Sequence, residues 1–179
     1  MREVVALEFL TLDGVMEAPA WTAPYRNDEH SAYAREQLFS ADALLLGCVT
    51  YEGFAEAWPR AADEQGFAER MNALPKHVAS ATLQNPGWQN SQVLGRDTPQ
   101  AVRELKAQPG QDILIYGSAE LVRSLTRDGL IDEHRLWIYP IILGKGKRLF
   151  ADGEPPVNLV LKGTRAFSSG TLALTYGRE

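Results

Sequence analysis

The sequence predicts one α/β domain over residues 1–179, with a mixed and mostly parallel central sheet that is flanked by helices and ends in antiparallel strands. The segments Val4–Leu12 and Ala41–Leu46 are short and apolar, as expected of strands that are covered on both faces. Helical periodicity between the strands over the first two thirds of the chain favours parallel pairing. After Asp132 three strands follow one another, which favours antiparallel pairing in the last third.

The first half of the chain alternates strands with helices. A long irregular connection over 17–28, which holds two prolines and Trp21, follows the first strand and leads to a helix expected over His30–Phe39. A helix is also expected over Asp63–Leu74, because apolar residues recur there at helical spacing. The segment KHVAS then forms a third short strand that ends at Ser80.

The second half continues this alternation before the pattern changes. The segment SQVLG is an expected edge strand, and the helix after it contains Val102 and Leu105. The strand ILIY then runs through Gly117 into an amphipathic helix. The last three strands, which we expect to be joined by turns, are RLWIYPIIL, PVNLVLKGTRAF and GTLALTYGR.

Composition excludes several classes of protein. A hydrophobic fraction of 45% over 179 residues suits one core, and a net charge of −5 without a basic stripe argues against a nucleic-acid partner. The apolar stretch Leu136–Leu143 is far shorter than the roughly 18 residues of a membrane span, and no signal peptide is evident, so no membrane partner is expected. Cys48 is the single cysteine, which favours a reducing compartment and a cytoplasmic location.

The segment ILIYGSAELVRSL, residues 113–125, carries the strongest chemical signal. A strand that turns through a glycine into a helix points free backbone N–H groups and the positive end of the helix dipole at one spot. Phosphate groups bind in such places, although a glycine there also serves purely steric needs.

Several segments together carry a resemblance to a known family. They occur in the family's order and spacing, and they are TLDG (11–14), LLLGCVTYEGF (44–54), KHVASATL (76–83), ILIYGSAELV (113–122) and GLIDEHRLWIYPIILGKGKRLF (129–150). The chain resembles the dihydrofolate reductase-like superfamily, specifically stand-alone proteins similar to the C-terminal reductase domain of the bifunctional riboflavin-biosynthesis deaminase-reductase. The resemblance covers nearly the whole chain and implies a dihydrofolate reductase-like three-layer fold. It also implies a homodimer, with Trp137 and Tyr139 either at the interface or buried within one subunit.

The resemblance further implies a nicotinamide dinucleotide, usually NADPH, across the carboxyl ends of the central strands. Two turns would hold its phosphates and a third would line the adenosine half. The residues implied are Gly47, Cys48, Val49 and Thr50 in the first turn, Gly117, Ser118, Ala119, Glu120 and Leu121 in the second, and Ser80 and Thr82 in the third. The alternative is that Thr50 and Ser118 only cap helices and that Ser80 only ends a strand.

The cofactor side departs from the family's pattern at Cys48, where the superfamily commonly has an arginine that pairs with the 2′-phosphate of NADPH. A thiol does not form such a contact, so NADH is possible as well, unless Arg96 or Lys76 replaces the missing charge. A reactive thiol at the helix start is a further alternative for Cys48.

The substrate side departs at two positions. The carboxylate that fixes the pterin ring in dihydrofolate reductases falls on Ser31, which disfavours folate. Riboflavin-pathway reductases usually have a glutamate where Tyr116 stands, so the sequence does not decide whether an aminopyrimidine is the substrate.

Three residues are candidates for the chemistry. Asp13 is a candidate catalytic acid or substrate anchor, with an ordinary Asp-Gly turn as the alternative. Tyr116 either donates a proton or only packs its ring, and Trp21 either closes over the ligand or anchors its loop. The small basic cluster around Lys147 is expected to be a solvated crossing, and the three histidines occur singly, so no metal site is predicted.

Two functions remain open from the sequence. The first is an NAD(P)H-dependent reductase of a small pyrimidine- or pterin-like heterocycle, resembling 5-amino-6-(5-phosphoribosylamino)uracil reductase and dihydrofolate reductase. The alternative is a non-catalytic homodimer that binds a nucleotide or another small ligand on the same fold.

Overall fold

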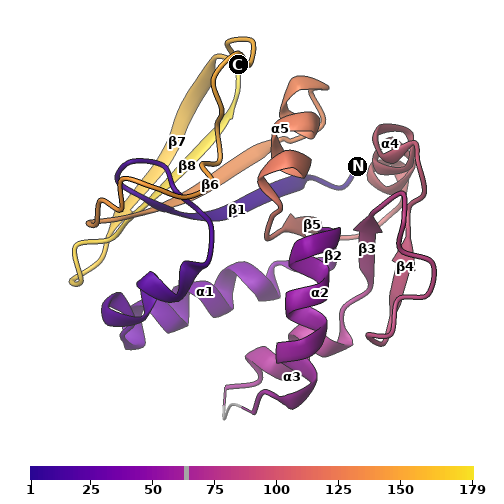
Figure 1. Ribbon diagram of the computed structural model, residues 1–179, viewed down its shortest axis with the longest axis horizontal. Coiled ribbons are helices and arrows are strands. Elements are labelled where there is room, and N and C mark those ends of the chain that lie inside the picture. The colour runs from indigo at the N-terminus through magenta and orange to yellow at the C-terminus, as the bar shows by residue number, and fades with distance from the viewer. Residues whose placement is uncertain (63–64) are drawn as a thin grey trace.

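The protein is described by a computed structural model, which covers residues 1–62 and 65–179. An eight-stranded sheet crosses the molecule in the order β4-β3-β2-β5-β1-β6-β8-β7 (Figure 1). Its strands are β1 (Val4–Thr11), β2 (Ala41–Gly47), β3 (Lys76–Ala79), β4 (Ser91–Val93), β5 (Asp112–Ile115), β6 (Glu133–Tyr139), β7 (Leu159–Ala166) and β8 (Leu172–Arg178). The helices are α1 (Asp28–Phe39), α2 (Cys48–Ala57), α3 (Phe67–Ala73), α4 (Thr98–Ala107) and α5 (Ala119–Arg127), with short 3-10 segments η1 (Pro19–Tyr25) and η2 (Trp58–Arg60).

The predicted fold class is confirmed, because β4, β3, β2, β5, β1 and β6 pair in parallel while β8 is antiparallel to both β6 and β7. The expected antiparallel pairing of the last three strands is confirmed, since β6 and β7 both pair with β8 in that direction, and β6 has a parallel partner as well. That strand runs parallel to β1, from Val5↔Glu133 to Thr11↔Tyr139, and pairs with β8 on its other side. The reason is that α5 carries the chain back to the edge where β1 began, so the next strand enters in the same direction.

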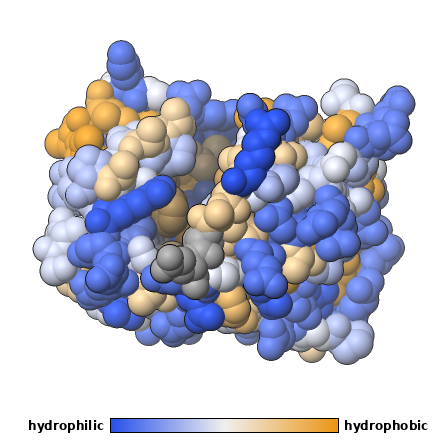
Figure 2. Space-filling model, turned by 90° about the horizontal axis from the view of Figure 1, so that it is seen from below, coloured by the Kyte–Doolittle hydropathy of each residue, from blue (hydrophilic) through white to orange (hydrophobic). Residues whose placement is uncertain are grey.

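Helices cover the two faces of the sheet (Figure 1). Apolar residues of α4 and α5, such as Val102 and Val122, pack on one face. Leu38 of α1, Tyr51 of α2 and Met71 of α3 pack on the other. The molecular face in Figure 2 is mostly hydrophilic and is hollowed near its middle.

The aromatic residues of β6 belong to a third cluster. Trp137 and Tyr139 are fully buried within the single chain, where they pack with Phe167 against α1 and the η1 segment. Burial within one subunit is therefore the correct alternative for these two side chains.

The element boundaries differ from the expected ones by a few residues. The helix expected over Asp63–Leu74 is α3, which begins at Phe67, and its expected first two residues lie outside the described part of the chain. The strand expected to end at Ser80 ends at Ala79. Within residues 1–62 and 65–179, no helix is long and apolar enough to cross a membrane.

Candidate functional site

Two glycine turns meet at the carboxyl ends of neighbouring strands. Because β2 and β5 pair in parallel, Gly47 and Gly117 leave the sheet at the same edge. The N–H of Gly47 donates a hydrogen bond of 3.1 Å to the carbonyl of Gly117. A Cβ atom at Gly47 would lie 2.5 Å from Ser118 Oγ and 2.9 Å from its backbone nitrogen, and Gly117 has a φ of +101°. Both positions therefore require glycine.

The helices that follow these turns begin without a side-chain cap. Ser118 occupies the N-cap position of α5, as expected, but its hydroxyl accepts no cap hydrogen bond within the described residues, and the N-cap of α2 is Gly47, which has no side chain. The other long helices differ, since Asn27 caps α1 and Asp97 caps α4. The first-turn N–H groups of α2 and α5 are thus left available, side by side, in an arrangement suited to an anion.

The first turn of α2 adds a hydroxyl group to this arrangement. Thr50 Oγ1 would lie 3.0 Å from a Cβ at Gly117, so this hydroxyl reaches from α2 to the turn that precedes α5. Val49, in the same turn, is 78% exposed. The thiol of Cys48 points along its own helix and lies 3.7 Å from Glu52 Oε1.

Glu8 lies behind the second glycine turn, and sequence reasoning missed it. It is 3% exposed on the central strand β1, and its Oε1 has no hydrogen-bond partner among the described residues. Burial raises the pKa of this carboxyl well above its ordinary value, and a hydrogen bond from the Gly117 backbone only partly opposes that effect. The available signal was a single acidic residue within the apolar strand VVALEFL.

Asp13 joins the turn after β1 to the segment after β6. Its Oδ1 accepts hydrogen bonds from the Thr11 hydroxyl at 2.6 Å and the Leu143 N–H at 3.2 Å, and its Oδ2 accepts one from the Gly144 N–H at 2.8 Å. The Thr11 contact, followed by the backbone contacts, lowers the pKa of Asp13 to about 2. At neutral pH this carboxylate is therefore a hydrogen-bond acceptor without a proton to donate.

Tyr116 lies between the strand β5 and Gly117, and its ring packs 6.1 Å from that of Phe54. Burial raises the pKa of its phenol, so the hydroxyl keeps its proton across the physiological range. This hydroxyl can donate a hydrogen bond but is a weak acid.

Trp21 and Ser31 lie on the side of the sheet that α1 covers. The Trp21 ring packs edge-on against Tyr139 at 5.3 Å, and its indole N–H donates to the Glu17 carbonyl at 3.1 Å. These contacts are those of a residue that anchors its loop. Ser31 is half-buried on α1, next to His30, whose Nε2 lies 2.5 Å from the Tyr139 hydroxyl.

The turn after β3 lies one strand away from Gly47, because β3 pairs with β2. Ser80 Oγ accepts hydrogen bonds from the backbone N–H groups of Thr82 and Leu83, at 3.2 and 3.0 Å. The Thr82 side chain is exposed. Ser80 therefore organises the turn, and Thr82 faces outward from it.

Lys76 is not available to a phosphate group, which excludes one of the two residues considered as replacements for the charge missing at Cys48. Its side chain is fully buried, and Nζ donates hydrogen bonds to the carbonyls of Asn72, Leu74 and Gln89. Arg96 remains exposed in the loop before α4.

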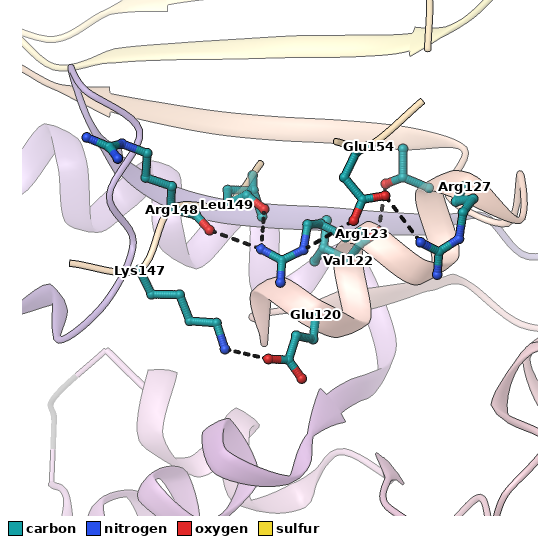
Figure 3. A network of polar contacts seen from close by, with 9 residues as sticks. Glu120, Val122, Arg123, Arg127, Lys147, Arg148, Leu149 and Glu154 are labelled. Carbon is teal, nitrogen blue, oxygen red and sulfur yellow. Dashed lines mark hydrogen bonds and ion pairs between the residues drawn. The ribbon is translucent and has the colours of Figure 1, made fainter. Parts of the chain in front are cut away.

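The basic cluster near Lys147 is exposed, as expected of a solvated crossing, and its segment also contacts α5 (Figure 3). Lys147 Nζ lies 2.7 Å from Glu120 Oε1 on the first turn of the helix. Arg123 of α5 donates hydrogen bonds to the carbonyls of Arg148 and Leu149, both at 3.3 Å (Figure 3). The segment after β6 thus lies along α5, close to the second glycine turn.

A separate open hollow of about 940 Å³ lies between α2, α3 and residues 87–89. Its lining includes Tyr51, Trp88 and two carboxylates, Glu52 and Glu69. Two negative charges disfavour an anionic ligand there, so the hollow is a poorer phosphate site than the paired turns. Across residues 1–62 and 65–179, no group of three or more His, Cys, Asp or Glu side chains is placed to hold a metal ion.

Comparison with known proteins agrees with this architecture. The family model described as the RibD C-terminal domain matches residues 2–173. The uncharacterized protein YyaP of Bacillus subtilis (strain 168) is 30% identical over 178 residues, which covers 98% of this chain and 94% of that protein.

Two solved structures share the fold. A putative riboflavin biosynthesis protein from Shewanella sp. PV-4 superposes with a TM-score of 0.80 at 18% identity, covering 100% of this chain and 99% of the other. A diaminohydroxyphosphoribosylaminopyrimidine deaminase/5-amino-6-(5-phosphoribosylamino)uracil reductase from Thermotoga maritima gives 0.69 at 16% identity, covering 99% of this chain and 57% of the other. These similarities confirm the fold expected from the sequence.

Proposed function

The chain belongs to the RibD C-terminal domain family, and from that membership we propose that it is an NAD(P)H-dependent reductase of a small pyrimidine- or pterin-like heterocycle. The observation that carries the proposal is the pair of uncapped helix starts, α2 and α5, held together by the Gly47–Gly117 hydrogen bond. Two such helix starts provide several backbone donors and two positive dipole ends for a diphosphate. The T. maritima relative is described as a reductase of a phosphoribosylamino-uracil, which supports the substrate class.

The residues of the two turns fit the cofactor's phosphates. In the proposed complex the N–H groups of residues 48–50 and 119–121 bind phosphate oxygens, with the Thr50 hydroxyl between them. The turn with Ser80 and Thr82 borders the adenosine half, since β3 lies beside β2. The cofactor itself supplies the hydride, so the protein's task is to position it against the acceptor.

NADPH is the proposed cofactor, with NADH also accepted. Cys48 stands where a charged contact to the 2′-phosphate is expected, and a thiol adds no attraction for that group. Lys76 is buried against carbonyl groups and is not available to replace the charge. Arg96, exposed in the loop before α4, is the remaining candidate for that contact. Without a contact from Arg96, we expect the two dissociation constants to differ by less than about tenfold, which corresponds to 1.4 kcal/mol.

The substrate is proposed to bind between the turn after β1 and helix α1, near Asp13, Trp21 and Ser31. Asp13 acts there as an anion that holds the segment after β6, because its oxygens already accept three hydrogen bonds. Tyr116 offers a phenolic O–H at the carboxyl end of β5 and serves as a hydrogen-bond donor.

The alternative is a non-catalytic binder of a nucleotide or small ligand, and the observations in its favour are Cys48 and Tyr116, which replace the family's usual charged residues. Calorimetric titration with NADPH and NADH, followed by a screen for oxidation of the reduced cofactor with aminopyrimidines and pterins, separates the two functions. Binding with turnover supports the reductase, and binding without turnover on any heterocycle supports the binder. If neither dinucleotide binds, the reductase is wrong, and so is a binder whose ligand is one of these dinucleotides.

A further inference from the structure

A buried carboxyl group with an unused oxygen lies directly behind the second glycine turn. Glu8 is 97% removed from solvent on the central strand, and one of its oxygens, Oε1, has no hydrogen-bond partner among the described residues. The other oxygen, Oε2, lies 3.8 Å from the Cβ position of Gly117, whose backbone donates a hydrogen bond to the carboxyl. An orphaned polar atom in a folded interior is unusual and calls for a specific reason.

Side chains from three parts of the chain lie close to Gly117. Thr50 Oγ1 of α2 and Met16 Cε of the loop after β1 would lie 3.0 and 3.6 Å from a Cβ at Gly117. The absence of a Cβ thus lets a hydroxyl, a flexible thioether and the Glu8 carboxyl approach the backbone of one glycine. Met16 is only partly buried and can shift to admit a ligand group.

The chemistry of the carboxyl narrows the kind of group that it can bind. Burial raises the pKa of the carboxyl and so favours its neutral form. A neutral carboxyl presents one O–H donor and carbonyl-type acceptors. A primary amide presents the matching acceptor and donors, so the two groups satisfy each other without moving a charge out of water.

We propose that Glu8 recognises the carboxamide group of the nicotinamide ring, with Oε1 as the atom that this group satisfies. This inference rests on the proposed function, because it requires a nicotinamide dinucleotide at the paired glycine turns. Glu8 is then the residue that selects the nicotinamide end of the cofactor, while the first turns of α2 and α5 hold its phosphates. It explains why a polar side chain is retained in the apolar segment VVALEFL.

The test compares ligands in which this group is present, is replaced, or is absent together with the ring. Calorimetric titration measures the dissociation constants of NADP⁺, of its 3-acetylpyridine analogue, in which a methyl ketone replaces the carboxamide, and of 2′-phospho-ADP-ribose, which lacks the ring. The wild-type protein is expected to bind NADP⁺ about tenfold more tightly than the analogue, the size expected of one hydrogen bond in a buried site. Binding of 2′-phospho-ADP-ribose reports on the phosphate site alone.

Two substitutions and a matched control complete the test. Glu8→Gln keeps a donor and an acceptor and should keep the preference for NADP⁺, whereas Glu8→Met keeps the length and should reduce the preference to less than about twofold. Affinity for 2′-phospho-ADP-ribose should be unchanged in both variants, and the exposed control Glu36→Gln should behave as the wild type.

Several results would overturn the inference. If folded Glu8→Met protein still prefers NADP⁺ over the analogue as strongly as the wild type does, the inference is wrong. It is also wrong if the wild type binds the two dinucleotides equally well, and this second result does not depend on whether Glu8→Met folds. Both results leave the proposed cofactor site intact if 2′-phospho-ADP-ribose binds. A wild type that binds none of the three ligands removes the proposed function and the inference with it.

Discussion

Lys76 shows at the scale of one residue how this chain keeps a cation inside its core. Its ammonium group donates to three carbonyls and lies 4.2 Å from the centre of the Trp88 ring. Desolvation lowers its pKa to about 8, so the group is still mostly protonated at neutral pH. The contacts join the end of α3 to the segment before β4, which makes Lys76 a structural residue.

Lys76→Met should lower the free energy of unfolding by about 2–4 kcal/mol, because three buried carbonyls lose their donor. Urea denaturation at pH 7 measures this loss, with the exposed Lys145→Met as the control. A change below about 0.5 kcal/mol, as is usual for surface positions, would contradict the structural role.

His134 should make stability depend on pH. Burial lowers its pKa to about 4, so between that value and the 6.5 of the unfolded chain the unfolded state binds more protons. The contribution of His134 is complete above pH 6.5 and is lost as the pH falls toward 4, to a total of at most about 3 kcal/mol. Unfolding free energies of wild type and His134→Phe between pH 7 and 4 check this, and the variant should show the flatter profile. Parallel profiles would show that His134 does not titrate in this way.

Some properties of single residues could be predicted from the sequence, and others depend on contacts between distant parts of the chain. The need for glycine at positions 47 and 117 could be predicted, because a strand that turns into a helix leaves little room. The partners of Asp13 could not, since the N–H groups of Leu143 and Gly144 lie 130 and 131 positions away in the chain. The unpaired Oε1 of Glu8 could not be predicted from the sequence either, because the burial of one atom depends on tertiary packing.

At the scale of elements, the glycine turn between β2 and α2 provides a matched pair of substitutions. Gly47→Ala places a methyl group against the backbone of Ser118, whereas a Cβ at Gly53, within α2, meets nothing within 4 Å. Gly47→Ala should cost about 1–3 kcal/mol of stability and abolish dinucleotide binding. Gly53→Ala should stabilise the protein by up to about 1 kcal/mol and leave binding unchanged. Thermal unfolding and calorimetry on both variants measure these effects, and equal effects of the two would refute the close approach of the turns.

The pairing of the turn after β1 with the segment after β6 is a second element-scale feature. Asp13→Asn removes the negative charge that accepts three hydrogen bonds. The amide hydrogens of Leu143 and Gly144 should then exchange faster, and turnover or ligand binding should weaken, because this segment borders the proposed substrate site. Hydrogen-exchange NMR measures the first effect. Unchanged exchange and unchanged binding would remove Asp13 from the site.

Element order was largely predictable, since the spacing of apolar residues alone separates helices from strands in the first two thirds of the chain. The direction of β6 was not predictable in this way. An apolar run such as RLWIYPIIL has the same pattern in a parallel and an antiparallel pair, and only the α5 crossover decides between them.

At the scale of the whole molecule, the proposed homodimer has surface available in the last strands. The edge strand β7 is mostly exposed, and Leu161 and Leu172 on β7 and β8 are 51% and 43% exposed. Exposed apolar side chains on an open sheet edge favour association with a second copy. Sedimentation velocity at micromolar concentration should show a dimer, and a monomer would contradict the proposal.

The central claim is that a nicotinamide dinucleotide binds with its phosphates between the first turns of α2 and α5. Titration of the ¹⁵N-labelled protein with NADPH, followed through the amide resonances, tests it most directly. The N–H signals of residues 48–50 and 119–121 should shift together and saturate at one equivalent, while those of Asn72 and Trp88 in the separate hollow stay in place. Saturable shifts confined to the hollow, or no saturable shift at the two helix starts, would contradict the claim.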